Sequence, residues 1–495
     1  MKRRLSEEYR YSECSPLCHH GAKLLEVHIT EGCMRLWWFG FAFSLFFLGM
    51  FGSNVSSADE IERLEKKLEY LKARELLVNE LNSIQEQIEN LDEQYQDLAE
   101  ETSLPTEQIN TESEDTSIQD NSSSDPPDVS SNNTKIHLEV GPQVKLLGDL
   151  ELGITVFPDM AIAVMQQTPT LRLLLAATEE GNPKHSSYLL EGTSFENLTS
   201  ATKVLEVGAS GEFDSGYAGI SGAYKHSDGT WYAFYHGEDR ENMPPIPIGG
   251  LEGYYGTIGA ASSTDDGRTW EKLGPIITSN KPKGWTAYDG QFDSGAGIPG
   301  FVVSKNGDYL YAYYYEMSRV DGRGAQTCLA RSRISDGPPL PGTWEKYYNG
   351  TFGEPGLGGK DTPVMSGTVF AEDGFALGAH PVYSKELDKY IMVVNIGFAS
   401  ELDFLGGKLS QSGIYFSFSD DAISWAKPEP LIIDHAVPQY GRSLSWEATI
   451  VWDEGSSTNG WLIYAYTPAW GADRYSGYSL SYMVGRRVTA SSSPY

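Results

Sequence analysis

Cysteine is scarce in this chain of 495 residues. Three of the four cysteines precede the one long hydrophobic run, and Cys328 stands alone in the large C-terminal part. A disulfide framework is therefore excluded within that part, so its hydrophobic core must stabilise it unaided. We expect Cys328 to be a small buried apolar residue rather than a nucleophile.

Positive charge and helical periodicity are scarce as well. The chain has 37 Lys and Arg residues against 68 Asp and Glu residues, a net charge of −31, and its pI is about 4.6. Because an acidic surface repels a phosphate backbone, we expect no nucleic-acid partner. After residue 100 no stretch has a helical pattern, and the 52 Gly and 29 Tyr residues favour a turn-rich, all-β fold.

The N-terminal part divides into a polar tail, 1–33, and a segment, 34–58, with an uncharged run of 17 residues at 36–52. Two interpretations stay open, because a run of this length suits both a short anchor and a signal peptide. The first is a single-pass type II membrane anchor. The second is translation from Met34 and secretion after cleavage near Asp59. In both, the rest of the chain lies outside the cytoplasm.

The next two segments predict a stalk. Apolar residues at three-four spacing from Ile61 to Leu98 predict a coiled coil over 59–100, and hence a homo-oligomer. Residues 101–134 are rich in Ser, Thr, Asn, Asp, Glu and Pro and almost free of aromatic residues, which is typical of a disordered linker.

Residues 135–495 are expected to form one β domain. A strand–turn–strand unit occurs twice, beginning GEFDSGYAGISGAYK at 211–225 and GQFDSGAGIPGFVVS at 290–304. Three further pairs of strands have the same order of elements, at 158–164 with 171–178, 379–384 with 389–398, and 446–452 with 460–466. Together with an opening strand at 136–140 that would close a ring, the five units predict a five-bladed β-propeller.

Two hairpins support this prediction. The sequence STDDGRTW at 263–270 resembles the Asp-box of sialidases and related propellers, and FSDDAISW at 418–425 resembles a degenerate copy. We expect a structural role, in which Asp265 caps its own turn and Gly267 adopts a positive φ.

The blade count and the acidic residues at the blade mouths resemble the five-bladed glycosidases of the arabinanase, xylosidase, invertase and levansucrase type. The resemblance implies that carboxylates at the starts of innermost strands converge on a central funnel. The matching positions are Asp159, Asp214, Asp293, His380 and Glu447. The third blade has Ile-Pro-Gly at 298–300 where the resemblance implies a catalytic glutamate, so Glu447, Glu316 and Glu238 stay open as the acid.

We therefore predict glycoside hydrolysis by paired carboxyl groups, with a carbohydrate as the partner. The predicted catalytic residues are Asp159, Asp214, Asp293 and Glu447. The predicted substrate-binding residues are His236, Trp285, Tyr288, Glu316, His380 and Trp446. No metal site and no cofactor are assigned, and a structural Ca²⁺ in the funnel stays open.

Three alternatives to this prediction remain. In the first, Asp214 and Asp293 only cap their own turns. In the second, the protein is a carbohydrate-binding propeller without catalysis. In the third, it is a coiled-coil surface scaffold whose propeller binds protein.

Overall fold

The computed structural model describes residues 134–494, apart from 183, 244–252, 286–292, 319–325, 371–373, 399–411, 438–440 and 472–481. The predicted tail 1–33, anchor or signal segment 34–58, coiled coil 59–100 and linker up to residue 133 lie outside the described residues. In the described part of the chain, no helix has the length and apolar character needed to cross a membrane.

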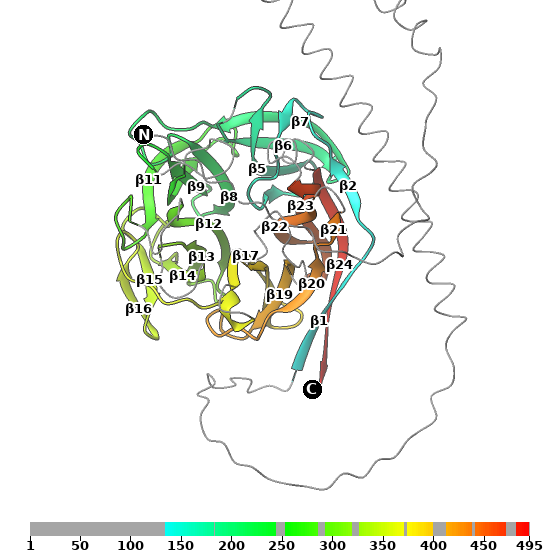
Figure 1. Ribbon diagram of the computed structural model, residues 1–495. Coiled ribbons are helices and arrows are strands. Elements are labelled where there is room, and N and C mark those ends of the chain that lie inside the picture. Colours follow the sequence, from blue (N-terminus) through cyan, green and yellow to red (C-terminus); the bar gives the residue numbers. More distant parts are fainter. Residues whose placement is uncertain are drawn as a thin grey trace, which may run out of the picture. The chain divides into compact units, whose positions relative to one another are not determined.

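The described residues are almost entirely β-structure, in successive antiparallel units around a common centre (Figure 1). The first unit comprises β3 (Ile154–Thr155), β4 (Ala163–Gln166), β5 (Leu171–Glu179), β6 (Ser186–Ser194) and β7 (Asn197–Leu205). The second comprises β8 (Tyr217–Lys225), β9 (Trp231–Asp239), β10 (Tyr255–Ser263) and β11 (Glu271–Thr278). The third comprises β12 (Ser294–Val303), β13 (Tyr309–Glu316), β14 (Gln326–Arg333), β15 (Trp344–Tyr348) and β16 (Thr351–Pro355).

The last two units complete the ring. The fourth comprises the 3-10 helix η1 (Gly367–Val369), β17 (Gly374–Ser384), β18 (Lys389–Phe398), β19 (Gly413–Ser419) and β20 (Glu429–Ile433). The fifth comprises β21 (Ala436–Val437), β22 (Gly441–Trp452), β23 (Asn459–Gly471), β24 (Tyr482–Pro494), β1 (Thr134–Val140) and β2 (Val144–Leu147). A short parallel contact between β10 and β12 joins the second and third units into one sheet.

The ring is closed by the first strand of the domain. β1 pairs antiparallel with β24, in a register that runs from Thr134 opposite Pro494 to Val140 opposite Val488. Ile136, in the middle of β1, is fully buried in the core shared by the fourth and fifth units. The prediction of a ring-closing opening strand at 136–140 is confirmed, and the ends of the domain are joined without a disulfide.

The core lies between the units because most strands are apolar on both faces. In β13 the side chains alternate, so Ala312 and Tyr314 pack towards the second unit while Tyr311 and Tyr313 pack towards the fourth. Cys328, on the neighbouring strand β14, is buried in the first of these two interfaces, as expected. The Tyr-rich strands thus act mainly as packing layers.

The hairpin at 263–270 has the predicted structural role. The Asp265 carboxylate accepts hydrogen bonds from the backbone N–H groups of Arg268 (3.1 Å) and Thr269 (3.0 Å) and from the Thr269 hydroxyl (2.7 Å). Gly267 has φ +81°, and in the second hairpin Ala422 holds the corresponding position at φ +64°.

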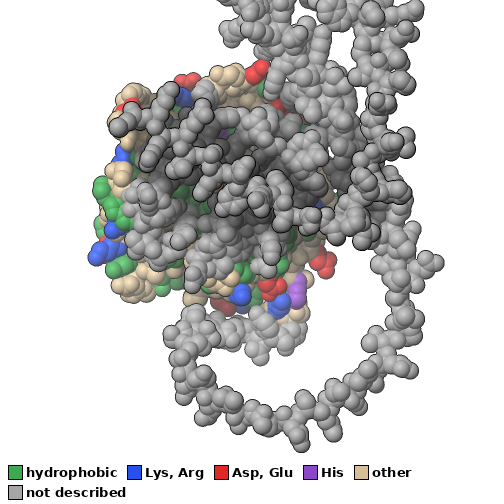
Figure 2. Space-filling model, viewed as in Figure 1, with side chains coloured by type: hydrophobic (Ala, Val, Ile, Leu, Met, Phe, Trp, Pro, Cys, Tyr) green, Lys and Arg blue, Asp and Glu red, His purple; other side chains and the backbone are tan. Residues whose placement is uncertain are grey.

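On the face shown in Figure 2, acidic and basic side chains of the described residues are interspersed at the margin of the domain.

Candidate functional site

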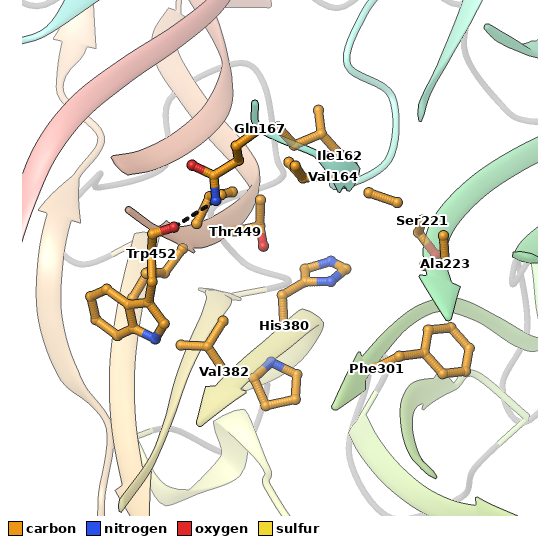
Figure 3. Close-up of a pocket in the computed structure, with 15 residues that line it drawn as sticks. Ile162, Val164, Gln167, Ser221, Ala223, Phe301, His380, Val382, Thr449 and Trp452 are labelled. Carbon is orange, nitrogen blue, oxygen red and sulfur yellow. Dashed lines mark hydrogen bonds between the residues drawn. The ribbon is translucent and has the colours of Figure 1, made fainter. Parts of the chain in front are cut away.

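The innermost strands enclose a cavity of about 290 Å³ at the centre of the ring. Five inner strands contribute to its wall, through residues that include Val164 of β4, Ser221 of β8, Phe301 of β12, His380 of β17 and Thr449 of β22. Figure 3 shows these side chains around one space, with His380 near its middle. Because the inner strands share this space, residues near their starts are brought together at one end of it.

Three inner strands carry a bulge at corresponding places. In the pairing of β12 with β13, of β17 with β18 and of β22 with β23, two residues of the inner strand stand opposite one residue of its partner, so each bulge holds one extra residue. The first of the two bulged residues is Ile298, Gly378 or Glu447, and all three have a positive φ, at 41°, 59° and 53°. Such bulges redirect a side chain, and a β-branched residue in this conformation is strained. The equivalent positions carry Ile, Gly and Glu, so the fifth unit alone of the three has a carboxylate there.

Four acidic residues form what we call the central carboxylate cluster: Asp159, Glu238, Asp293 and Glu447. Glu238, on β9, is 5% exposed. Its Oε1 lies 3.3 Å from His236 Nε2, and its Oε2 accepts a hydrogen bond from Arg240. Burial opposes ionisation of Glu238, but the His236 hydrogen bond and the Arg240 charge outweigh it and hold its pKa below the usual value. The surroundings of Glu238 therefore favour its ionised form.

Asp159 has the opposite shift. It precedes β4, and its Oδ2 lies 3.0 Å from His185 Nε2. Burial raises its pKa well above the usual value, and the charges of Glu238 and Glu447 raise it further. Burial also lowers the pKa of His185 to about 4, so the imidazole is neutral at pH 7 and supplies no compensating charge. The surroundings of the Asp159 carboxyl thus disfavour its ionised form.

Asp293 is a second carboxyl group with a raised pKa near the charge of Glu238. Its Oδ1 accepts the backbone N–H of Tyr254 at 3.3 Å. Burial is the first cause of its raised pKa and the charge of Glu238 is the second. The Tyr254 ring stands 5.7 Å from the Arg240 guanidinium, and its hydroxyl lies 2.6 Å from that of Tyr315.

Glu447 lies deeper and is 1% exposed. Its backbone N–H donates to Asn395 Oδ1 (3.1 Å), and Asn395 in turn donates to the Ser445 carbonyl (2.8 Å). His380 Nε2 is 3.6 Å from Glu447 Oε2. Within the described residues neither Glu447 oxygen has a hydrogen-bond partner. His380 also lines the cavity of Figure 3, so it links Glu447 to the wall of that cavity.

The cluster therefore combines one carboxyl group whose pKa is lowered with two whose pKa values are raised, and such opposed shifts favour acid–base chemistry by two carboxyl groups. Among the described residues, no group of three or more metal-ligating side chains lies close enough to hold a metal ion.

Of the predicted catalytic residues, Asp214 lies elsewhere. Its side chain is 1% exposed and its Oδ2 is 2.6 Å from Lys272 Nζ on β11. Its charge acts on Tyr235, which packs in the core between the first and second units. The repeated Phe-Asp-Ser-Gly motif is not structurally equivalent, because Asp214 stands three residues before β8 and Asp293 one residue before β12. The two copies of the motif thus place their aspartates differently, and Asp214 contacts Lys272 rather than the central carboxylate cluster.

Two predicted binding residues also lie apart from the cluster. The Glu316 carboxylate, at the end of β13, interacts with Lys346 and Asp361. Trp285 is half-buried after β11, with Lys281 Nζ 4.9 Å from its ring centroid. Trp446 is partly buried beside Glu447 in β22, and Tyr288 lies outside the described residues. His236 and His380 are in contact with members of the cluster, as described above.

Sequence reasoning named Glu238 only as a rival for the acid and missed Arg240, His185 and Tyr254. A usable signal was present at the end of β9. His236, Glu238 and Arg240 are spaced two residues apart, and this spacing puts alternate side chains on one face of an extended strand. A polar triplet on one face of a strand that is otherwise apolar indicates a polar site.

Comparisons with known proteins give similarity in structure only. No protein-family model matches the sequence, and no curated protein matches it. A solved "Glycoside hydrolase" aligns at 14% identity over 70% of this chain and 92% of its own, with a TM-score of 0.44. An exo-1,5-alpha-L-arabinanase from a bovine ruminal metagenomic library aligns at 11% identity over 68% and 94%, with a TM-score of 0.42.

A third solved structure is a family 117 glycoside hydrolase from Zobellia galactanivorans. It aligns at 12% identity over 73% of this chain and 92% of its own, with a TM-score of 0.43. These identities and TM-scores are too low to transfer a reaction, a substrate or a residue role to this chain.

Proposed function

We propose that this protein hydrolyses a glycosidic bond at the central carboxylate cluster. The observation that carries the proposal is the opposed titration of neighbouring carboxyl groups, with the pKa of Glu238 lowered and those of Asp159 and Asp293 raised. Glycoside hydrolysis needs one ionised and one protonated carboxyl group flanking the bond. Burial and neighbouring charges separate the two forms, so both are available at one pH.

The roles follow from the protonation states. Glu238 is the carboxylate that activates water or attacks the sugar, and Arg240 with His236 keeps it ionised. Asp293 or Asp159 donates the proton to the departing oxygen. Tyr254 orients Asp293 through its backbone N–H, and His185 orients Asp159.

The test is a glycan panel assayed with the purified full chain for release of reducing ends. We expect Glu238→Gln to lower the rate by about 10²–10⁴, because it removes the ionised group. Asp293→Asn and Asp159→Asn identify the general acid. Only the variant that changes the general acid should lose activity on substrates with poor leaving groups. Asp228→Asn is the matched control, because Asp228 is an exposed carboxylate in the β8–β9 turn. Full activity in all three cluster variants would refute the proposal.

A carbohydrate-binding protein without catalysis is the second candidate. It is favoured by Ile298, which stands at a bulge position equivalent to that of Glu447 and packs against Met160, Ala176 and Tyr217. Saturable binding of a glycan in the same panel, without product release by the wild-type chain, would decide for this candidate.

We also propose a five-bladed propeller displayed outside the cytoplasm on an oligomeric stalk. The support is the five antiparallel units and the sequence patterns at 34–58 and 59–100. Sedimentation of the full chain tests the oligomer, and a monomer would refute it. Protease accessibility in intact cells tests the location, and protection of the domain would refute it.

A further inference from the structure

A second buried group of ionisable residues lies outside the central carboxylate cluster, against the third unit. Its centre is Lys346 on β15, whose side chain is fully buried. Lys346 Nζ donates to the Thr278 carbonyl (2.7 Å) and the Gly359 carbonyl (2.9 Å), and it lies 3.2 Å from Asp361 Oδ2. Asp361 follows β16, and its side chain is 7% exposed. An amine and a carboxyl group are thus held at contact distance away from water.

Two residues of β13 complete this group. The Tyr314 hydroxyl donates to the same Asp361 oxygen at 3.0 Å, and the Tyr314 ring centroid lies 5.4 Å from Lys346 Nζ. Glu316 is 2% exposed. Its Oε1 accepts the Ser318 backbone N–H (2.9 Å), and a hydrogen bond from the Ser279 side chain also acts on the carboxyl group. The carboxyl group is thus buried in a polar setting away from water.

The protonation state of Glu316 differs from that of an ordinary glutamate. Burial, and then the charge of Asp361, raises its pKa to about 7, against the opposing charge of Lys346. At neutral pH both the acid and its conjugate base are therefore populated. Such a group can accept a proton from an ammonium and donate one to a neighbouring carboxylate.

We propose that Lys346 and Asp361 join through an intramolecular amide bond, with Glu316 as the proton carrier. Glu316 takes one proton from the Lys346 ammonium and passes it to Asp361. The resulting amine attacks Asp361 Cγ, and a C–N bond forms as one C–O bond breaks. Glu316 then takes a second proton from the nitrogen and gives it to the departing oxygen, which leaves as water. No oxidant or other reactant is consumed, since a carboxylic acid and an amine yield an amide and one water.

The surroundings favour the amide over the ion pair. Removing two charges from water is unfavourable, and a neutral amide avoids that cost. The amide nitrogen keeps one hydrogen, so one of the two carbonyl bonds now made by Lys346 is given up. The pair Lys389–Asp420 provides a comparison within the chain, because its lysine is also buried but its aspartate side chain is 47% exposed. Water there favours the ion pair, and we expect no bond.

The test is tryptic peptide mapping of the full chain, produced in a host without N-glycosylation because of the Asn349-Gly-Thr sequence. Without the bond, trypsin cuts after Lys346 and yields separate peptides 334–346, 347–360 and 361–385. With it, cleavage after Lys346 is blocked and peptide 334–360 is joined to 361–385, with a mass lower than their sum by one water, about 18 Da. Separate peptides from the wild-type chain would overturn the proposal.

Variants separate the bond from its mechanism. Lys346→Met should abolish the joined peptide. If this variant does not fold, the wild-type digest and the Glu316→Gln variant still test whether the amide bond forms. Glu316→Gln is nearly isosteric and should reduce the joined fraction at least tenfold while circular dichroism shows a folded domain. Full joining in Glu316→Gln would refute the role of Glu316. Glycan hydrolysis is measured in parallel, and its loss or absence has no bearing on the peptide masses.

Discussion

Asp214→Asn is predicted to destabilise the domain and to leave the chemistry intact. The change removes the charge that faces Lys272 at 2.6 Å, on an aspartate that is 1% exposed. Loss of one partner of a buried ion pair costs about 3–5 kcal/mol. Because the Lys272 side chain is 27% exposed and can reach water, we expect the lower value of about 2–3 kcal/mol. With about 2.1 cal/mol/K of unfolding entropy per residue over roughly 360 residues, the melting temperature should fall by about 3–4 °C.

The matched variant is Asp293→Asn. The Asp293 carboxyl is held in its protonated form by burial, so a neutral amide of the same shape replaces a neutral acid. We expect its melting temperature to change by less than about 1 °C, since neutral isosteric changes away from packing defects cost little. Thermal unfolding followed by circular dichroism measures both variants.

A double-mutant cycle with Lys272→Met tests the cause of the Asp214 effect. If the ion pair is responsible, the Asp214→Asn/Lys272→Met variant should be less destabilised than the sum of the two single changes, with a coupling of about 1 kcal/mol or more. An Asp214→Asn protein that melts like the wild type but loses glycan binding or hydrolysis would refute this reasoning and place Asp214 in the functional site.

Three further outcomes are expected. The pH dependence of kcat/KM should have an acidic limb below the usual glutamate value, where Glu238 becomes protonated, and a basic limb well above the usual aspartate value, where the acid loses its proton; a single limb would contradict the paired mechanism. Asp265→Asn should lower stability by about 1 kcal/mol and spare function, because it weakens the hydrogen bonds that cap its own turn; urea unfolding measures this, and loss of function at wild-type stability would contradict it. The pKa of Asp265 is lowered to about 2, chiefly by the Thr269 hydrogen bond. The stability that Asp265 contributes is therefore present above the pKa of an unfolded aspartate and is lost as the pH falls towards 2. Gly378→Ala should lower the free energy of unfolding by about 1–2 kcal/mol, since φ is +59° there. It should also lower activity, because the new Cβ would stand 3.5 Å from Glu447. Unchanged unfolding and kcat would show that the bulge tolerates a side chain.

Much of the fold could be predicted because it depends on local patterns. The strand predicted at 389–398 matches β18 residue for residue, and the opening strand closes the ring with β24 as expected. The role of Asp265 was also predictable, because every group that it binds lies within four residues of it. Alternation, turns and caps are properties of short stretches, so a sequence alone determines them.

The candidate site could be predicted only in part. Asp159 and Asp293 were found because they precede the inner strands β4 and β12, whereas Glu447, predicted at the start of its strand, stands at the bulge in the middle of β22. Glu238 was undervalued because it ends a second strand, and its importance depends on His236 and Arg240 keeping it charged.

Asp214 shows what only the tertiary structure decided. It shares its local motif with Asp293, yet Asp214 contacts a lysine from β11, whereas burial and the charge of Glu238 raise the pKa of Asp293. An aspartate's charge state depends on which distant groups surround it and on how much water reaches it. The sequence determined that both residues stand at turns before inner strands, and the packing of the units determined which of them joins the central carboxylate cluster.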